Sequence, residues 1–128
     1  MQLGVPKFLD TLRRGVRGLT GGRTATSTAR VATERPERYG KQLVSHMSRR
    51  HGGEWSAESA SGWMQLGSGR ATVRAEEATL VIDVTGSDPG QLAGLEDVVG
   101  RHLAKFGAKE GLVVDWRRSD GTRGSHQP

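Results

Sequence analysis

The segment that most constrains the fold is SDPGQLAGLEDVVGRHLAKFG, residues 87–107, because it carries the start and stop signals of one amphipathic helix. Asp88 is suited to cap this helix, Pro89 fits its first turn, and Gly107 stands where a left-handed C-terminal residue is common. The apolar residues recur at helical spacing, at Leu92, Leu95, Val99, Leu103 and Phe106. A helix with one apolar stripe must bury that stripe against another element.

The elements around this helix supply such a surface. A second helix is predicted over residues 36–51, with Tyr39, Leu43 and Met47 on its apolar stripe. Strand-like alternation predicts β segments within residues 27–34, 61–67, 70–75, 78–84 and 110–118. The order is β-α-β-β-β-α-β. Because each helix has one apolar stripe and each strand one apolar face, we predict an α+β fold with both helices on one face of a mainly antiparallel sheet.

Charge and composition divide the chain into three parts. Residues 1–24 carry five bases and one acid (+4), so the remaining 14 bases and 13 acids leave the rest of the chain at +1. We expect residues 1–27 to be a basic arm and linker, in which residues 5–19 have the spacing of an amphipathic helix. A single domain over residues 28–118 and a disordered tail over residues 119–128 complete the prediction. The arm is a candidate for weak contact with an anionic membrane or nucleic acid.

The composition also excludes several classes of protein. The chain has no cysteine, which rules out a disulfide framework, a thiolate metal site and cysteine catalysis. No apolar run approaches the roughly 18 residues typical of a membrane span, and the N-terminus lacks a secretory apolar segment. We therefore expect a soluble, cytoplasmic protein, in which an exposed edge strand could support a homodimer.

Three motifs give the chain a family resemblance. The blocks ARVATERPERYGKQLVSHMSRR, LEDVVGRHLAKFG and LVVDW, taken in this order, resemble the bacterial family called domain of unknown function 2218, over roughly residues 28–117. The resemblance implies a fold similar to the phosphohexomutase C-terminal domain, which is TBP-like. Relatives of the family occur with siderophore-interacting flavin reductases, which implies an accessory role in iron or siderophore metabolism and such a reductase as a partner. The family has no established catalytic residue or cofactor, so none is carried over.

Two histidines are the first candidates for chemistry. On a helical wheel His46 falls on the apolar stripe of the first helix, and His102 lies at the edge of the second stripe. If the helices pack side by side, the two imidazoles could form a metal site or an acid–base pair, with Asp97 or Glu96 in support. The alternative is that each histidine is a hydrogen-bonded structural residue, and that Asp97 pairs with Arg101 on its own helix.

A basic surface around the first helix is the second candidate. Its members are Arg35, Arg38, Lys41, Arg49 and Arg50. Lys41 could hold a phosphate or carboxylate, although the chain has no glycine-rich phosphate loop and such residues usually form a solvated face. The residues selected as candidates for ligand binding are Arg38, Lys41, His46, Arg101 and His102.

The open face of the sheet is the third candidate. We expect it to carry Arg30, Thr72, Arg74, Asp83, Asp115 and Arg117, a mixture of signs suited to cross-strand pairs. The side of the sheet on which Trp63 lies is not determined by the pattern. Nucleic-acid binding by this face needs exposed aromatic rings and is therefore disfavoured.

The leading hypothesis is a noncatalytic module that binds a small ligand or a protein partner. The alternatives are a metal-dependent or acid–base enzyme using His46 and His102, and membrane or nucleic-acid association through the basic arm.

Overall fold

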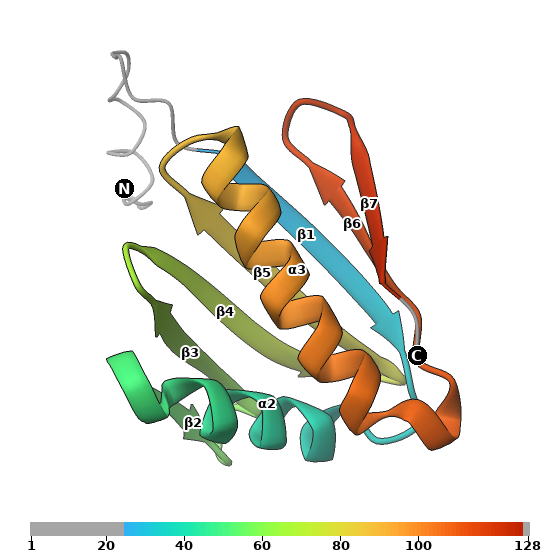
Figure 1. The fold of residues 1–128 in the computed structure, drawn as a ribbon. Coiled ribbons are helices and arrows are strands. Elements are labelled where there is room, and N and C mark those ends of the chain that lie inside the picture. Colours follow the sequence, from blue (N-terminus) through green and yellow to red (C-terminus); the bar gives the residue numbers. More distant parts are fainter. Residues whose placement is uncertain (1–24, 127–128) are drawn as a thin grey trace, which may run out of the picture.

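The computed structural model describes residues 25–126, which form a sheet with two long helices packed on one of its faces (Figure 1). The helices are α2 (Pro36–His51), α3 (Pro89–Phe106) and the short 3₁₀ helix η3 (Ala108–Glu110). The strands are β1 (Ala25–Ala32), β2 (Gly53–Ser56), β3 (Ser61–Leu66), β4 (Gly69–Glu76), β5 (Thr79–Gly86), β6 (Val114–Arg118) and β7 (Arg123–His126). The predicted α+β class and the one-sided helical layer are confirmed.

The strands form one sheet in the order β2-β3-β4-β5-β1-β6-β7, and every neighbouring pair is antiparallel. Strands β1 and β5 pair along their whole length at the centre. The helices α2 and α3 are the connections that carry the chain across the sheet, from β1 to β2 and from β5 to β6. The short strands β2 and β7 form the two edges.

Strand β7 corrects the prediction that residues 119–128 are a disordered tail. It pairs with β6 from Val114↔His126 to Arg117↔Arg123. The turn before it is held by Asp120, whose Oδ1 accepts hydrogen bonds from the Thr122 backbone N–H at 2.8 Å and the Thr122 hydroxyl at 2.7 Å. Because the β7 sequence RGSH has no apolar residue, hydrophobic alternation could not reveal it.

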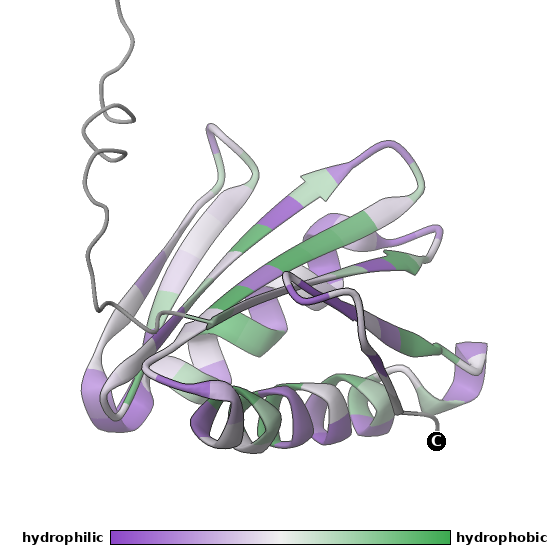
Figure 2. Ribbon diagram, turned by 90° about the horizontal axis from the view of Figure 1, so that it is seen from above, coloured by the Kyte–Doolittle hydropathy of each residue, from purple (hydrophilic) through white to green (hydrophobic). Residues whose placement is uncertain are grey.

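The core lies between the sheet and the helices. Hydrophobic and hydrophilic residues alternate along the strands (Figure 2), so that one face of the sheet is apolar. Leu43 of α2, Leu103 of α3 and Trp116 of β6 are completely buried there. Trp63 lies on the opposite face, since its neighbour Met64 is buried in the core. Among the helices that the structure describes, none combines the length and hydrophobicity needed to span a membrane.

The ends of α3 show one prediction confirmed and one corrected. Asp88 caps the helix as predicted, with Oδ1 accepting from the Gln91 N–H at 2.8 Å. Gly107 is not left-handed, because its φ is −99°. A Cβ at this position would lie 2.2 Å from Leu112 Cδ1, so the glycine is required for close packing. A left-handed glycine instead ends the following 3₁₀ helix η3, at Gly111 with φ of 67°.

Candidate ligand-binding site

The C-terminal half of α3 runs beside α2, and we call the surface where they meet the helical junction. Helix α2 contributes His46, Arg49 and Arg50, while α3 contributes His102 and Lys105. The two helices are brought together because each packs its apolar side on the same face of the sheet. Their adjoining edges consequently form a surface above the core.

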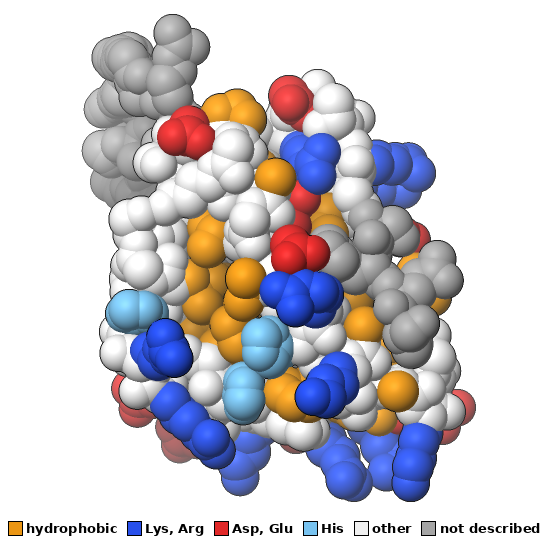
Figure 3. Space-filling model, in the orientation of Figure 1, with side chains coloured by type: hydrophobic (Ala, Val, Ile, Leu, Met, Phe, Trp, Pro, Cys, Tyr) orange, Lys and Arg blue, Asp and Glu red, His pale blue; other side chains and the backbone are white. Residues whose placement is uncertain are grey.

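His46 and His102 are adjacent across this junction. Their ring centroids lie 5.0 Å apart with an angle of 42° between the ring planes. The ring of Phe106 contacts both, with centroid distances of 5.5 Å to His46 and 6.3 Å to His102. Figure 3 shows two histidine side chains touching on the helical face, with Lys and Arg side chains near them. The side-by-side arrangement required by the sequence hypothesis is present.

His46 nevertheless lies outside the buried stripe on which the sequence analysis placed it. The buried arc of α2 runs from Tyr39 through Gly40 and Leu43 to Val44. At 100° per residue this arc spans about 140° in one direction from Tyr39, whereas His46 falls about 20° in the other direction. The residue is therefore exposed, and only its ring is covered in part by His102 and Phe106.

The two imidazoles differ in their surroundings. Partial removal from water lowers the pKa of His46 below its ordinary 6.5, and electrostatic interactions with His102, Arg49 and Lys105 lower it further. His102 is half-buried, and its Nδ1 lies 2.7 Å from the Val98 carbonyl oxygen. Since a carbonyl oxygen can only accept, Nδ1 carries a proton and Nε2 is the nitrogen left to act toward a ligand.

Two hollows lie along the helical junction. The first, of about 490 Å³, is lined by His46, Met47, Arg49, Arg50, Val98 and His102. The second, of about 600 Å³, lies nearer the start of α2 and is lined by Arg35, Arg38, Tyr39, Gln42, Lys105, Phe106, Ala108, Lys109 and Glu110. The two share no lining residue, but Phe106 lines the second hollow and contacts both histidines of the first.

The linings of these hollows are strongly basic. Together they contain six Lys and Arg residues and one acid, Glu110. None of the six forms an ion pair within 4.0 Å among the described residues. Glu110 is already engaged, because it accepts hydrogen bonds from the Tyr39 hydroxyl at 2.8 Å and the Thr33 hydroxyl at 3.1 Å. Such a lining favours an anionic ligand.

The hydrogen bond to Glu110 has a further effect on Tyr39. Hydrogen bonding to this carboxylate, followed by burial and the negative charge of Glu110, raises the pKa of the Tyr39 hydroxyl above its ordinary 10.0. Arg35 and Arg38 oppose this shift. The phenol in the lining of the second hollow is therefore held in its neutral form.

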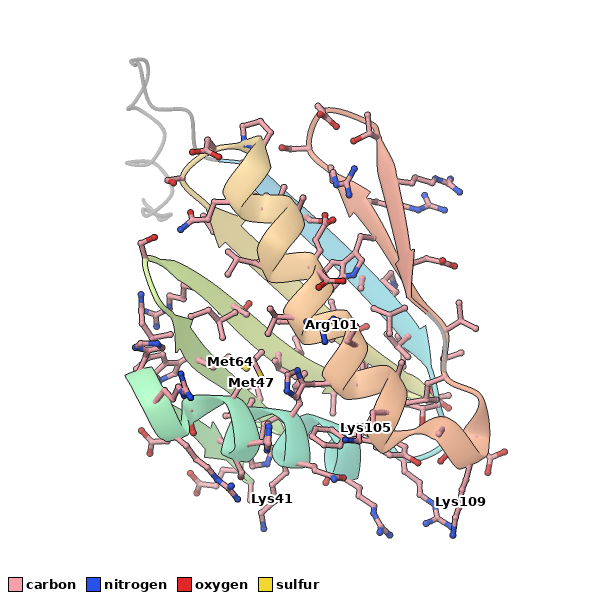
Figure 4. All side chains as sticks on the ribbon, in the orientation of Figure 1. Lys41, Met47, Met64, Arg101, Lys105 and Lys109 are labelled. Atoms are coloured by element: carbon pink, nitrogen blue, oxygen red, sulfur yellow. The ribbon has the colours of Figure 1, made fainter. Side chains whose placement is uncertain are left out.

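The other predicted candidates lie at varying distances from the hollows. Arg38 lines the second hollow. Lys41 is exposed on the side of α2 that faces away from α3, whereas Lys105 lies between the helices (Figure 4). Arg101 binds Asp97 through its Nε at 2.9 Å, the pair expected from their spacing. Lys41 and Arg101 therefore line neither hollow.

The acids proposed to support the histidines have other contacts. Glu96 is 1% exposed and receives a forked contact from Arg118, whose Nε and Nη2 lie 2.8 Å and 2.6 Å from its two oxygens. This pair ties α3 to β6. Within residues 25–126 no group of three or more potential metal ligands is found, so Asp97 does not complete a three-residue set with the two histidines.

The open face of the sheet carries the expected network of mixed charges. Glu76 accepts from Arg30 at 2.9 Å and from Arg74 at 2.8 Å, and Arg74 also lies 3.8 Å from Asp83. These contacts lower the pKa of Glu76, with the hydrogen bond from Arg74 as the largest cause. Val81 is paired between Arg30 and Arg74 and is buried although it points away from the helices.

A third hollow, of about 550 Å³, lies on this open face between β2, β3 and β4. The Arg70 guanidinium stacks over the Trp63 ring, 4.4 Å from its centroid. Hydroxyl groups from Ser56, Ser61 and Thr72 are also in the lining. The Trp63 side was left open by the sequence, although the alternation with Met64 contained the necessary signal.

Sequence reasoning missed Lys105 and Lys109 as members of the site. Lys105 lies in the last turn of α3 and Lys109 lies shortly after it, so both read as the ordinary solvated end of a helix. Their relevance depends on how α3 lies against α2, which no local pattern in the sequence specifies. Arg49 and Arg50 were predicted as part of the basic surface because they lie in the same predicted helix as His46.

Comparison with known proteins places the fold in context. A solved structure, the NMR structure of PA4090 from Pseudomonas aeruginosa, is similar with a TM-score of 0.53 and 24% sequence identity, covering 63% of this chain and 82% of that chain. At this identity the likeness shows the fold alone. No curated protein matches the chain. The family model described as "Uncharacterized protein conserved in bacteria (DUF2218)" matches residues 28–117, from β1 through both helices to β6. The chain therefore belongs to the DUF2218 family.

Proposed function

We propose that this protein is a noncatalytic binding module that takes a small oxyanion, such as a carboxylate or phosphate compound, at the helical junction. The observation that carries the proposal is the composition of the two hollows, which place six Lys and Arg side chains and two imidazoles around one acid that is already hydrogen-bonded. Positive side chains held on two packed helices bind oxyanions through charge-assisted hydrogen bonds.

The experiment is calorimetric titration of the full chain with citrate and with inorganic phosphate at low ionic strength. Arg49→Gln and Lys105→Gln should each weaken binding by about three- to tenfold, because each removes one charge from the junction. The matched control is Arg117→Gln, which removes an exposed arginine from β6. Equal affinity in all variants, or an equal loss in Arg117→Gln, would contradict the proposal.

An accessory role in iron or siderophore metabolism, in the cytoplasm, is the biological setting we propose from the family association. In this role the bound oxyanion belongs to the substrate or product of a siderophore-interacting reductase. The test is ferric-siderophore reduction by such a reductase with and without this chain, compared with the Arg49→Gln variant. An unchanged rate in all three samples would remove the role without affecting the binding proposal.

The second candidate function is metal-dependent or acid–base catalysis by His46 and His102. It is favoured by the 5.0 Å separation of the rings and by the orientation of His102 through Val98. Turnover of a defined substrate that is lost in His46→Ala, with folding retained, would support catalysis over binding. Residues 1–24 lie outside the described residues, so contact of the basic arm with membranes or nucleic acid stays a prediction.

A further inference from the structure

The arrangement of the two histidines points to a more specific ligand. We propose that the oxyanion bound at the helical junction is a chelate of a divalent transition-metal ion, and that His46 and His102 complete the coordination of the ion. The inference rests on the proposed function, because the carboxylates of the chelator would lie among the basic residues of the helical junction. The class of ligand is an anionic complex of nickel, copper or zinc with two neighbouring coordination positions open.

The separation of the imidazoles matches shared coordination. With metal–nitrogen bonds of about 2.0–2.1 Å, each ring centroid lies about 3.2 Å from the ion. Ligand angles of about 90° to 109° then place the two centroids about 4.5 to 5.2 Å apart. The observed separation of 5.0 Å falls within this range.

The hydrogen bonding of His102 suits the same role. Its Nδ1 is fixed at 2.7 Å from the Val98 carbonyl oxygen, which leaves Nε2 as the nitrogen with a free lone pair. Histidines that bind metals commonly donate the other ring N–H to a carbonyl or carboxylate, because this fixes the ring and raises its basicity. Both histidines line the same hollow, so one ion can reach both.

The surrounding charges explain why the ion should arrive as a chelate. Arg49 and Arg50 line the hollow, and Lys105 lies between the two helices (Figure 4). These cations repel a bare dication but attract the carboxylates of an anionic complex. The described residues also supply no third metal ligand beside the histidine pair. A chelator provides the remaining ligands of the metal ion and gives the complex a net negative charge.

The test uses the nickel complex of nitrilotriacetate, which is singly negative and leaves two neighbouring positions for imidazole. It is titrated calorimetrically into the full chain, beside aqueous nickel and metal-free citrate. His46→Ala and His102→Ala should each lower affinity for the complex at least about tenfold, because the second imidazole binds intramolecularly. His51→Ala is the control, since this exposed histidine ends α2 and does not line the hollow.

Arg49→Gln gives a second readout that a chance pair of surface histidines would not produce. It should weaken binding of the anionic nickel complex and strengthen binding of aqueous nickel, because the same positive charge acts oppositely on the two probes. A copper complex of the same chelator should broaden the ring NMR signals of His46 and His102 selectively.

Three results would overturn the inference. The first is that His46→Ala binds the nickel complex as tightly as the natural chain does. The second is that His51→Ala loses as much affinity for the complex as His46→Ala. The third is that Arg49→Gln changes the affinities for the complex and for aqueous nickel in the same direction. If citrate still bound with the dependence on Arg49 and Lys105 described above, the metal inference alone would fail. Loss of citrate binding as well would remove the proposed function with it.

Discussion

Tyr39 donates a hydrogen bond to Glu110 at 2.8 Å, and both residues belong to the lining of the second hollow. Glu110 is also the single acidic residue in the lining of the helical junction as the structure describes it. Glu110→Gln removes this negative charge and should raise citrate affinity about two- to fivefold, as expected for one exposed charge. Calorimetry measures the change, with Glu54→Gln on the open sheet face as the control. Weaker citrate binding in Glu110→Gln would contradict the proposal that the helical junction binds an anion.

The same contact predicts a loss of stability at alkaline pH. The pKa of Tyr39 is raised in the folded protein, mainly by its hydrogen bond to Glu110, relative to the ordinary 10.0 expected in the unfolded chain. Its contribution is therefore fully present below pH 10.0 and is lost as the pH rises through the folded value. The free energy of unfolding, measured by urea denaturation from pH 8 to 11, should fall less steeply in Tyr39→Phe. Identical pH profiles for the two proteins would exclude this linkage.

The ion pair between Glu96 and Arg118 should be important for stability. Glu96 is 1% exposed, and its side chain receives three hydrogen-bond contacts from Arg118. Glu96→Ala leaves the guanidinium without this partner and should lower the free energy of unfolding by about 2–4 kcal/mol. The exposed pair of Arg101 and Asp97 provides the comparison, because Arg101→Ala should cost less than about 1 kcal/mol. The free energies of unfolding are measured by chemical denaturation. A loss in Glu96→Ala no larger than that in Arg101→Ala would show that the buried pair is unimportant.

Two glycines, one inside α3 and one at its C-terminal end, should respond oppositely to substitution. A Cβ on Gly107 would lie 2.2 Å from Leu112, so Gly107→Ala forces a shift in the core and should cost about 1–3 kcal/mol. Gly94 lies in α3 with no heavy atom within 4 Å of an added Cβ. Gly94→Ala should therefore stabilise the protein by up to about 1 kcal/mol through helix propensity. Thermal unfolding distinguishes the two, and destabilisation by both would show that α3 does not have the described packing.

Local patterns predicted the framework of this fold well. The cap at Asp88, the apolar stripe of α3 and the alternation in β4 and β5 all follow from short-range rules, and the structure confirms them. The one-sided layer then follows from the need to bury each stripe. The chain order of these elements was sufficient for the fold class.

The remaining features depend on contacts between distant segments. Strand β7 is held to β6 by backbone pairing and by the Asp120 turn, neither of which leaves an apolar pattern. The requirement for Gly107 comes from the approach of Leu112, which is invisible before the chain is folded.

The candidate site was predicted only in part, because it too depends on contacts between distant segments. The sequence identified His46 and His102 as a possible pair, but it placed His46 on a buried stripe and did not include Lys105. The exposure of His46 follows from the true centre of the buried arc, which Val44 shifts away from it. Only the relative placement of α2 and α3 reveals the basic lining.

The most direct test of oxyanion binding at the helical junction is a ¹H–¹⁵N NMR titration of the full chain with citrate. If citrate binds there, the largest chemical-shift changes fall on α2 and α3, around Arg38, Arg49, His102 and Lys105, and they weaken at high salt. Changes concentrated instead around Trp63 and Arg70 on the open face of the sheet would contradict it.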